Sequence, residues 1–214
     1  SYSVTGIGTT TDTFIVIAPE YNSLPVTAIR QYTFQNKSQV IGIELPNSIT
    51  DIGTYAFNNC KLEEIDFKGD LLQWLNLNVD NYSDFYLYTS GVIRINNKIL
   101  TDIVIPDTIT KIRDYAFYNY NKLINLTIPD NITIVGEKAF ASCVNLTNIS
   151  LGRGIERLVG YTFSSCTSLE NIVIPDNIIQ MDDTFSSCTN LRNVSLGNGL
   201  KSLYGTFVGC TALT

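Results

Sequence analysis

The sequence predicts a β-rich solenoid, in which short coils stack and each coil adds a strand to a parallel sheet. Three observations predict this fold. Most of the phenylalanines form one row with a regular period of about 22–23 residues, which is typical of solenoid repeats. All five cysteines lie three residues after a phenylalanine of that row. An apolar pair at alternate positions follows most of these phenylalanines. Because a unit this short cannot bury its own apolar face, such units must stack on one another.

The row of phenylalanines is the clearest mark of the repeat. The intervals between its members are nearly equal, except for the longer interval between Phe57 and Phe117. The row comprises Phe34, Phe57, Phe117, Phe140, Phe163, Phe185 and Phe207. Stacked coils place equivalent positions above one another, so the row predicts a continuous buried spine. Burial of one such side chain contributes about 1.5–3 kcal/mol. This contribution requires neighbouring coils.

The cysteines occupy a single repeat position, and they are Cys60, Cys143, Cys166, Cys188 and Cys210. Their spacing matches no C-x-x-C or zinc-ribbon pattern. Parallel Cβ vectors on adjacent coils also fit the torsion of a disulfide poorly. We therefore expect five free thiols that are buried as small apolar groups.

Each coil carries two short strands. The first strand is predicted from apolar residues at alternate positions, which are Ile43/Leu45, Ile65/Phe67, Ile103/Ile105, Leu126/Ile128, Ile149/Leu151, Ile172/Ile174 and Val194/Leu196. A turn that begins with Pro or Gly ends this strand. The second strand is predicted from a further apolar pair, at Ile109/Ile112, Ile132/Val135, Ile155/Leu158, Ile178/Met181 and Leu200/Leu203.

The composition excludes several classes of function. The chain has no histidine, which removes Ser-His-Asp catalysis and histidine-based zinc sites. Its net charge is −6, with 14 Lys and Arg against 20 Asp and Glu, so a basic nucleic-acid-binding face is not expected. It has no apolar run of about 18 residues, so membrane insertion is not expected. Phosphate-loop, nucleophile-elbow and calcium-loop motifs are missing. We expect no enzyme, no cofactor and no metal.

The Leu-x-x-Ile-x-Ile-Pro and Ala-Phe-x-x-Cys blocks resemble the BspA-like, or treponemal-type, leucine-rich repeat. The resemblance covers nearly the whole chain, including the N-terminal segment from Tyr2 to Gly8 and the irregular stretch that ends at Ile95 to Pro106. It implies an α/β leucine-rich-repeat solenoid that is rich in β structure, a right-handed superhelix of about eight coils that are each about 22–23 residues long. It also implies a secreted or surface-exposed bacterial protein used for adhesion or partner binding, with no active site.

A single repeat domain over residues 1–214 is the expected organisation. Residues 1–30 are predicted to form an N-terminal cap, because an array needs an atypical end to shield its first coil. The C-terminus falls inside a repeat, which predicts a fragment of a longer array or multi-domain protein. Residues 68–99 interrupt the period as an insertion.

The insertion holds the aromatic residues that the repeat does not explain, which are Trp74, Tyr82, Phe85, Tyr86 and Tyr88. One interpretation is a binding hot spot on a regular scaffold. The other is that these rings pack against the solenoid and fill the gap left by a missing Ala-Phe block. Residues 92–100 predict a hairpin with an Asn-Asn turn.

Outward positions of the first strands predict two further surfaces. An acidic patch on the early coils comprises Glu44, Glu64, Asp66 and Asp102. An asparagine column on the later coils comprises Asn125, Asn148, Asn171 and Asn193. The column could be a partner-binding face, although stacked amides that hydrogen-bond along a ladder are the favoured interpretation.

We predict a non-catalytic protein-binding or adhesion module of a secreted or cell-surface bacterial protein. The expected partner is a protein ligand such as a host surface or matrix protein, and the chain is expected to be a monomer or weak dimer outside the cell. The alternative is a structural stalk or spacer with no ligand of its own. An enzyme whose site lies in residues 68–99 is the third hypothesis.

Overall fold

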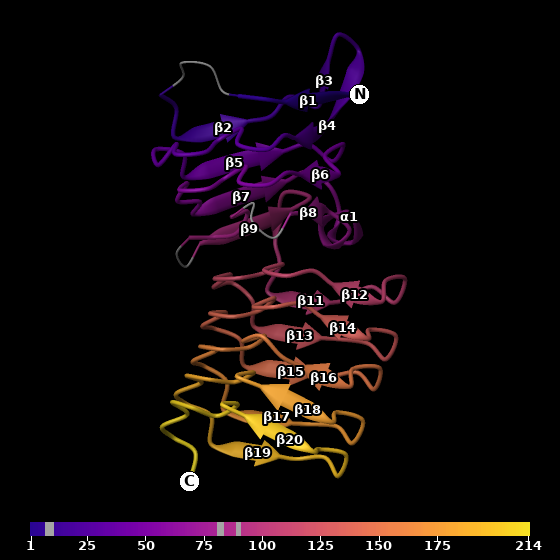
Figure 1. Ribbon diagram of the computed structural model, residues 1–214, viewed down its shortest axis with the longest axis vertical. Helices are drawn as coiled ribbons and strands as arrows, with labels where there is room; N and C mark the ends of the chain where they lie inside the picture. Colours follow the sequence, from indigo (N-terminus) through magenta and orange to yellow (C-terminus); the bar gives the residue numbers. More distant parts are fainter. Residues whose placement is uncertain (7–10, 81–83, 89–90) are drawn as a thin grey trace. The chain divides into compact units, whose positions relative to one another are not determined.

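The computed structural model describes residues 1–6, 11–80, 84–88 and 91–214. They form two compact units, Ser1–Ile99 and Leu100–Thr214, each of which is a stack of β-coils (Figure 1). The chain is a β-solenoid of about 8 coils of about 23 residues, with parallel sheets and little helix, as the period predicts. A single domain over residues 1–214 stays a prediction.

The described residues of unit 1 form two sheets. The first-strand sheet has the order β10-β9-β7-β5-β2, formed by β2 (Phe14–Val16), β5 (Gly42–Leu45), β7 (Glu64–Phe67), β9 (Val92–Ile95) and β10 (Lys98–Ile99). The second-strand sheet has the order β1-β4-β6-β8, formed by β1 (Tyr2–Val4), β4 (Leu24–Ile29), β6 (Asp51–Ile52) and β8 (Asn78–Val79). Strand β3 (Glu20–Tyr21) pairs antiparallel with β4.

Unit 2 repeats the pattern with shorter strands. The first-strand row comprises β11 (Asp102–Val104), β13 (Asn125–Thr127), β15 (Asn148–Ser150), β17 (Asn171–Val173) and β19 (Asn193–Ser195). The second-strand row comprises β12 (Lys111–Ile112), β14 (Ile134–Val135), β16 (Arg157–Leu158), β18 (Gln180–Asp182) and β20 (Ser202–Tyr204). The predicted strands are therefore present, and equivalent residues face one another across each parallel pair, as Leu126 faces Ile149.

The predicted phenylalanine spine is confirmed within each unit. Phe34 stacks on Phe57 in unit 1 with ring centres 5.0 Å apart. In unit 2, successive rings of the row from Phe117 to Phe207 stack with centres 5.5–6.2 Å apart and planes within 12° of parallel. Offset stacking of this kind adds about 0.5–1.5 kcal/mol per pair to the burial of the rings.

The chain turns at the phenylalanine, and we call residues −3 to +2 around it the Phe turn. The residues at −2 and +2 have positive φ in the described turns of the row, for example 55° at Tyr115 and 60° at Asn119. This alternation points the N–H groups at −2, 0 and +2 toward the next coil. Phe117 N donates to Ala139 O at 2.8 Å, and Asn119 N donates to Ala141 O at 2.9 Å. The turn therefore carries its own hydrogen-bond ladder.

The five cysteines are free and buried, as predicted. Each thiol donates to the carbonyl of the phenylalanine-row residue one coil earlier. Cys143 Sγ lies 3.2 Å from Phe117 O, and Cys188 Sγ lies 3.3 Å from Phe163 O. Burial raises the pKa of Cys60 to about 11 and that of Cys188 to about 12. The row thus supplies apolar packing and one weak donor per coil.

The insertion begins with the short helix α1 (Leu71–Leu75), which Asp70 starts through a capping box with Gln73. Trp74 and Phe85 are 1% and 2% exposed. The Trp74 ring lies 5.8 Å from Phe67 and 5.7 Å from Phe85. Phe85 also lies 5.2 Å from Phe57, so it takes the place in the row that the sequence left vacant. The packing interpretation is therefore confirmed for these two rings.

The predicted hairpin is present between β9 and β10, which pair antiparallel. Its turn residues Asn96 and Asn97 have φ values of 50° and 62°. Both residues therefore adopt the left-handed conformation that a two-residue hairpin turn requires.

Candidate functional site

Basic residues form ion pairs with the three carboxylates of the predicted acidic patch that lie in unit 1, while its role as a binding surface stays a prediction. Lys68 Nζ lies 3.1 Å from Glu44 Oε2 and 2.8 Å from Asp66 Oδ2. The hydrogen bond from Lys68 to Asp66 raises the pKa of the ammonium group. Lys68 directly follows β7, and this position places its ammonium group beside both carboxylates.

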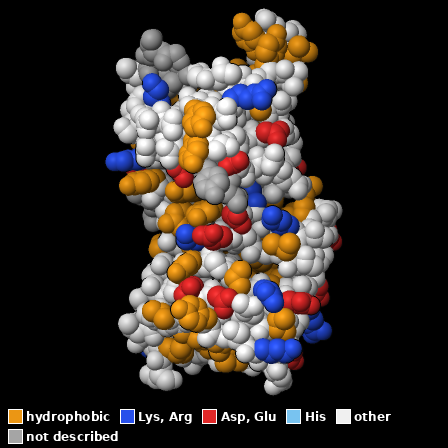
Figure 2. All heavy atoms as spheres, in the orientation of Figure 1, with side chains coloured by type: hydrophobic (Ala, Val, Ile, Leu, Met, Phe, Trp, Pro, Cys, Tyr) orange, Lys and Arg blue, Asp and Glu red, His pale blue; other side chains and the backbone are white. Residues whose placement is uncertain are grey.

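The other two carboxylates of the patch also have partners. Arg94 on β9 forms an ion pair with Glu64. In unit 2, Asp102 accepts hydrogen bonds from Asn125 and from Thr101 Oγ1, and these bonds lower the pKa of its carboxyl group. On the face shown in Figure 2, acidic and basic side chains are interspersed. The predicted site residues of the first strands are therefore engaged in local ion pairs and hydrogen bonds.

The asparagine column forms the predicted amide ladder in two segments. Asn148 Nδ2 donates to Asn125 Oδ1 at 2.6 Å, and Asn193 Nδ2 donates to Asn171 Oδ1 at 2.6 Å. These bonds satisfy the outward amides within the sheet, so they support the structural interpretation of the column.

The predicted aromatic surface of the insertion is divided by burial. Trp74 and Phe85 are core residues, so their rings cannot meet a partner, which corrects their place in the candidate surface. Tyr88 is 53% exposed, and Lys61 Nζ lies 5.6 Å from its ring centre. Tyr86 is partly buried and donates from its hydroxyl to Asp84 Oδ1 at 3.5 Å. Tyr82 lies outside the described residues.

Four tyrosines, of which Tyr32 and Tyr161 are exposed and Tyr55 and Tyr115 are half-buried, occupy the −2 position of the Phe turn. Tyr32 and Tyr55 hold it in unit 1, and Tyr115 and Tyr161 hold it in unit 2. Their φ values are 54–63°. Bulky side chains rarely adopt this conformation, and it costs about 1–3 kcal/mol per residue. Gly205 fills the same position at φ 60°, so the backbone does not require a large side chain there.

The tyrosine row of unit 1 consists of Tyr32 and Tyr55. Their rings stack with centres 5.7 Å apart and planes within 13°. Tyr32 is 50% exposed, so the edge of the stack faces solvent.

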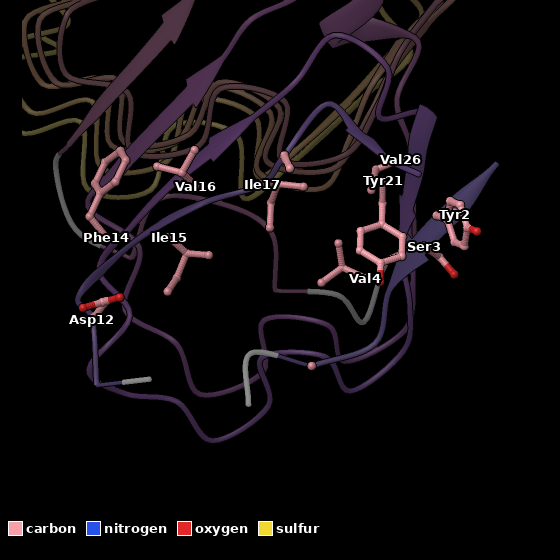
Figure 3. Close-up of a pocket in the computed structure, with 12 residues that line it drawn as sticks. Tyr2, Ser3, Val4, Asp12, Phe14, Ile15, Val16, Ile17, Tyr21 and Val26 are labelled. Atoms are coloured by element: carbon pink, nitrogen blue, oxygen red, sulfur yellow. The ribbon is translucent and has the colours of Figure 1, made fainter. Parts of the chain in front are cut away.

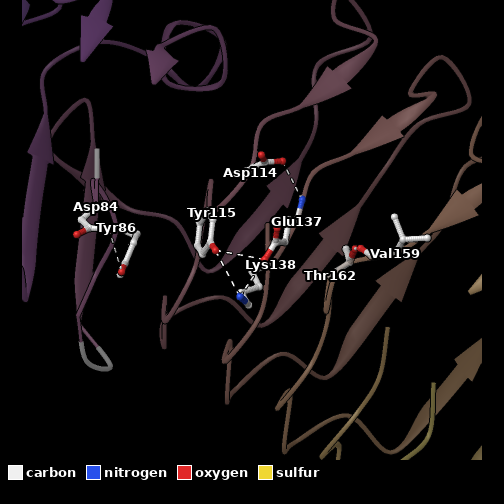
Figure 4. A network of polar contacts seen from close by, with 8 residues as sticks. All are labelled: Asp84, Tyr86, Asp114, Tyr115, Glu137, Lys138, Val159 and Thr162. Atoms are coloured by element: carbon white, nitrogen blue, oxygen red, sulfur yellow. Dashed lines mark hydrogen bonds and ion pairs between the residues drawn. The ribbon is translucent and has the colours of Figure 1, made fainter. Parts of the chain in front are cut away.

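The tyrosine row of unit 2 consists of Tyr115, Lys138 and Tyr161. Lys138 Nζ lies 5.4 Å from the centre of the Tyr115 ring and 5.6 Å from that of Tyr161. The ammonium group also donates to Glu137 Oε1 at 2.9 Å and to the Tyr115 hydroxyl at 3.4 Å (Figure 4). One cation thus connects the rings of the coils before and after it.

The electrostatics of this row keep the lysine charged. The hydrogen bond to Glu137 raises the pKa of Lys138, and partial burial raises the pKa of the Tyr115 hydroxyl. Both shifts favour a charged ammonium group on Lys138 beside an un-ionised Tyr115 hydroxyl. The sequence does contain a pattern that could have predicted these rows, because tyrosine stands two residues before four of the seven phenylalanines of the row.

A pocket of about 520 Å³ lies at the N-terminal coil of unit 1. Figure 3 shows Ile15 and Ile17 of and beside β2, with Val4 and Tyr21 across from them. Among the described residues that line it, Asp12 alone is charged. The pocket does not bring together the set of polar groups that fixes a small ligand.

Neither metal chemistry nor a membrane span is indicated by the described part of the chain. Within it, no group of three or more His, Cys, Asp or Glu side chains is placed to hold a metal ion. No described helix has the length and apolar character needed to cross a membrane. Parallel β-coils with side-chain ladders on their surfaces define a repeat protein of the solenoid class.

The chain belongs to the family described as the BspA type leucine rich repeat region. The family's sequence model matches six copies over residues 19–79 and 95–214. The resemblance stated from the repeat blocks is therefore confirmed.

Solved bacterial structures share the fold. A leucine rich cell surface protein from Faecalibacterium prausnitzii matches with a TM-score of 0.56 and 18% identity, over 99% of this chain and 89% of that chain. A leucine-rich repeat protein from Bacteroides ovatus matches with a TM-score of 0.56 and 27% identity, over 92% of this chain and 49% of that chain.

The pneumococcal vaccine antigen PcpA matches with a TM-score of 0.52 and 18% identity, over 87% of this chain and 60% of that chain. The chain thus spans about half of the Bacteroides ovatus protein and somewhat more of the pneumococcal antigen. No curated protein sequence matches the chain.

Proposed function

We propose that the chain is a non-catalytic protein-binding module of a secreted or cell-surface bacterial protein, and that its tyrosine rows form the contact surface. The observation that carries this proposal is a set of four tyrosines, two exposed and two half-buried, at a left-handed backbone position. The fold accepts glycine at this position, so the tyrosine side chain must contribute something other than backbone geometry.

Tyrosine is suited to such a surface. It offers a large and rigid contact area with a polar tip, and it loses little conformational entropy on binding. Tyrosine is also among the residues that most often dominate binding energies. Stacking on a neighbouring ring or on Lys138 holds each side chain in place before a partner arrives, which lowers the ordering cost of binding. The cell-surface description of the Faecalibacterium protein supports an extracellular partner.

The experiment measures binding of the intact chain to immobilised fibronectin, collagen and mucin. One variant carries Tyr32→Asn with Tyr55→Asn, and a second carries Tyr161→Asn. Asparagine tolerates positive φ, so both variants should keep the circular dichroism spectrum and the urea midpoint. We expect at least one of them to lose ~10-fold or more in affinity, which corresponds to about 1.4 kcal/mol.

Tyr204→Ser is the matched control, because Tyr204 is 73% exposed but lies on β20 outside the rows. Tyr88→Ala tests the remaining exposed aromatic of the insertion. Full binding by both row variants would show that the rows are not the contact surface. An intact chain that binds none of the three proteins would favour the stalk or spacer role.

A further inference from the structure

The strand ladders of unit 2 stop at one junction between coils. The first-strand row consists of the sheets β11-β13-β15 and β17-β19, and the second-strand row consists of β12-β14 and β16-β18-β20. Both interruptions fall between the coil of residues 129–151 and the coil of residues 152–174. All residues of these two coils are described, so the interruptions belong to the structure of this segment.

Individual hydrogen bonds show the same interruption. One coil before the junction, Gly136 N donates to Ile112 O at 3.0 Å and Ile128 N donates to Ser150 O at 2.9 Å. The equivalent donors at the junction are Val159 N and Leu151 N. Neither makes a hydrogen bond within residues 91–214.

The asparagine ladder is interrupted at the same place. It joins Asn125 to Asn148 and Asn171 to Asn193. Across residues 129–174, all of which are described, no hydrogen bond joins Asn148 to Asn171. Main-chain and side-chain ladders thus agree on the position of the junction.

Two turns hold the coils together, along with one backbone bond beside the Phe turn, from Ser168 N to Val144 O at 3.1 Å. At the Phe turn, Lys138 N, Phe140 N and Ser142 N donate across the junction at 2.8, 3.0 and 2.7 Å. At the opposite turn, Arg153 N donates to Asp130 Oδ1 at 2.8 Å. The backbones are so close there that a Cβ on Gly154 would lie 2.2 Å from Asp130 O. The junction is therefore closed at both turns and open along both sheets.

We propose that this junction is a hinge at which the two coils rock about the line that joins the two turns. Rocking in one direction brings the first-strand row together and spreads the second, and rocking in the other direction does the reverse. At the other junctions between coils of unit 2, hydrogen bonds between paired strands resist this motion. The core stays filled, because Ile132 and Ile155 are fully buried on either side. A groove of about 360 Å³ between β14 and β16, lined by Ile134, Arg157 and others, leaves space for the motion.

The hinge divides the tyrosine row of unit 2. Lys138 precedes the junction and Tyr161 follows it, and their contact of 5.6 Å crosses it. Because both residues lie at the Phe turn, on the axis of the motion, rocking changes the angle between the two parts of the surface while their contact is kept, and lets the surface adapt to the shape of a partner. This consequence rests on the proposed function, whereas the hinge itself does not.

Amide hydrogen exchange of the intact chain, followed by NMR, tests whether the junction is open. Leu151 and Val159 should exchange ~10-fold or more faster than Ile128 and Gly136, because exchange of a bonded amide needs local opening. Equal protection of the two pairs would show that the ladders are closed and would overturn the proposal.

Spin-label distance measurements test whether the junction moves. One sample carries nitroxides at Ile134→Cys and Arg157→Cys, which face each other across the junction. The control carries them at Lys111→Cys and Ile134→Cys, which are paired in a closed sheet. The native cysteines are buried, so labelling is confined to the new sites. We expect a broader distribution across the junction. Equal widths would mean an open but rigid junction and would overturn the hinge, and neither experiment depends on partner binding.

Discussion

The rings of Phe140 and Phe163 stack with their centres 5.5 Å apart and their planes within 11°. Both residues are fully buried, and they lie on coils whose strands do not pair with each other. Ring packing and the Phe turn therefore hold this junction where the sheets do not. Each of these rings stacks on the rings of the coils before and after it, so the removal of one ring disturbs the packing of three coils.

Replacement of Phe163 by alanine should destabilise unit 2 by about 3–5 kcal/mol. The substitution removes a buried ring and leaves a cavity that the stacked rings on either side cannot move to fill. Urea unfolding followed by far-ultraviolet circular dichroism measures the change. Val173→Ala is the matched control, since Val173 is 68% exposed, and it should change stability by no more than about 0.5 kcal/mol. Similar midpoints for the two variants would contradict a spine that supports the stack.

The buried thiols should make the protein less stable at alkaline pH. Burial raises the pKa of Cys188 to about 12, against an ordinary value of 9.0. Below pH 9 the thiol is protonated in both folded and unfolded chains, so its contribution is complete. As pH rises from 9 toward 12, the unfolded thiol ionises first and the contribution is lost.

Cys188→Ala should therefore show a smaller fall in urea midpoint between pH 9 and pH 11 than the parent chain, since the two chains differ only at this residue. A thiol reagent at pH 8 should label none of the five cysteines in the folded protein and all five in urea. Rapid labelling of the folded chain, or identical pH slopes for parent and variant, would contradict the burial of the row.

The repeat period predicts most of the fold because equivalent residues must face one another in stacked coils. Phe140, Cys143 and Ile149 therefore reveal both their burial and their neighbours. One interpretation of the sequence had the rings of the insertion fill the missing position, but it did not identify Phe85 as the ring that does so, because the distance from Phe57 exceeds the repeat period and no alanine precedes Phe85. Local sequence does not show that α1 takes up the extra length.

Surface chemistry was harder to predict because it depends on contacts between coils. Glu44 and Asp66 suggested an acidic surface until the chain brought Lys68 beside them. The tyrosines of the Phe turn gave a sequence signal, but their unusual backbone conformation is visible only in the structure. The interruption at residues 129–174 has no sequence signal, since the strand pattern continues through it without a change of period.

Trp74 should report on unit 1 through its fluorescence. It is the single tryptophan, and it is 1% exposed between Phe67 and Phe85. We expect blue-shifted emission and weak quenching by acrylamide in the folded chain, with a red shift on unfolding. Phe85→Ala should shift the emission to longer wavelength before any denaturant is added, whereas Tyr88→Ala should not. Strong quenching in the native protein would restore Trp74 as a surface residue.

Glycine at the turn after the first strand is required by the close approach of the preceding coil. A Cβ on Gly152 would lie 2.2 Å from Pro129 O, and neither backbone segment can move away without losing the bond from Arg153 N to Asp130. Gly152→Ala should therefore destabilise the chain by about 1–3 kcal/mol through overpacking. Gly6→Ala is the matched control, because a Cβ there meets no atom of the described residues within 4 Å. Thermal unfolding of the two variants checks this, and an unchanged midpoint for Gly152→Ala would show that the turns are not the fixed points of the stack.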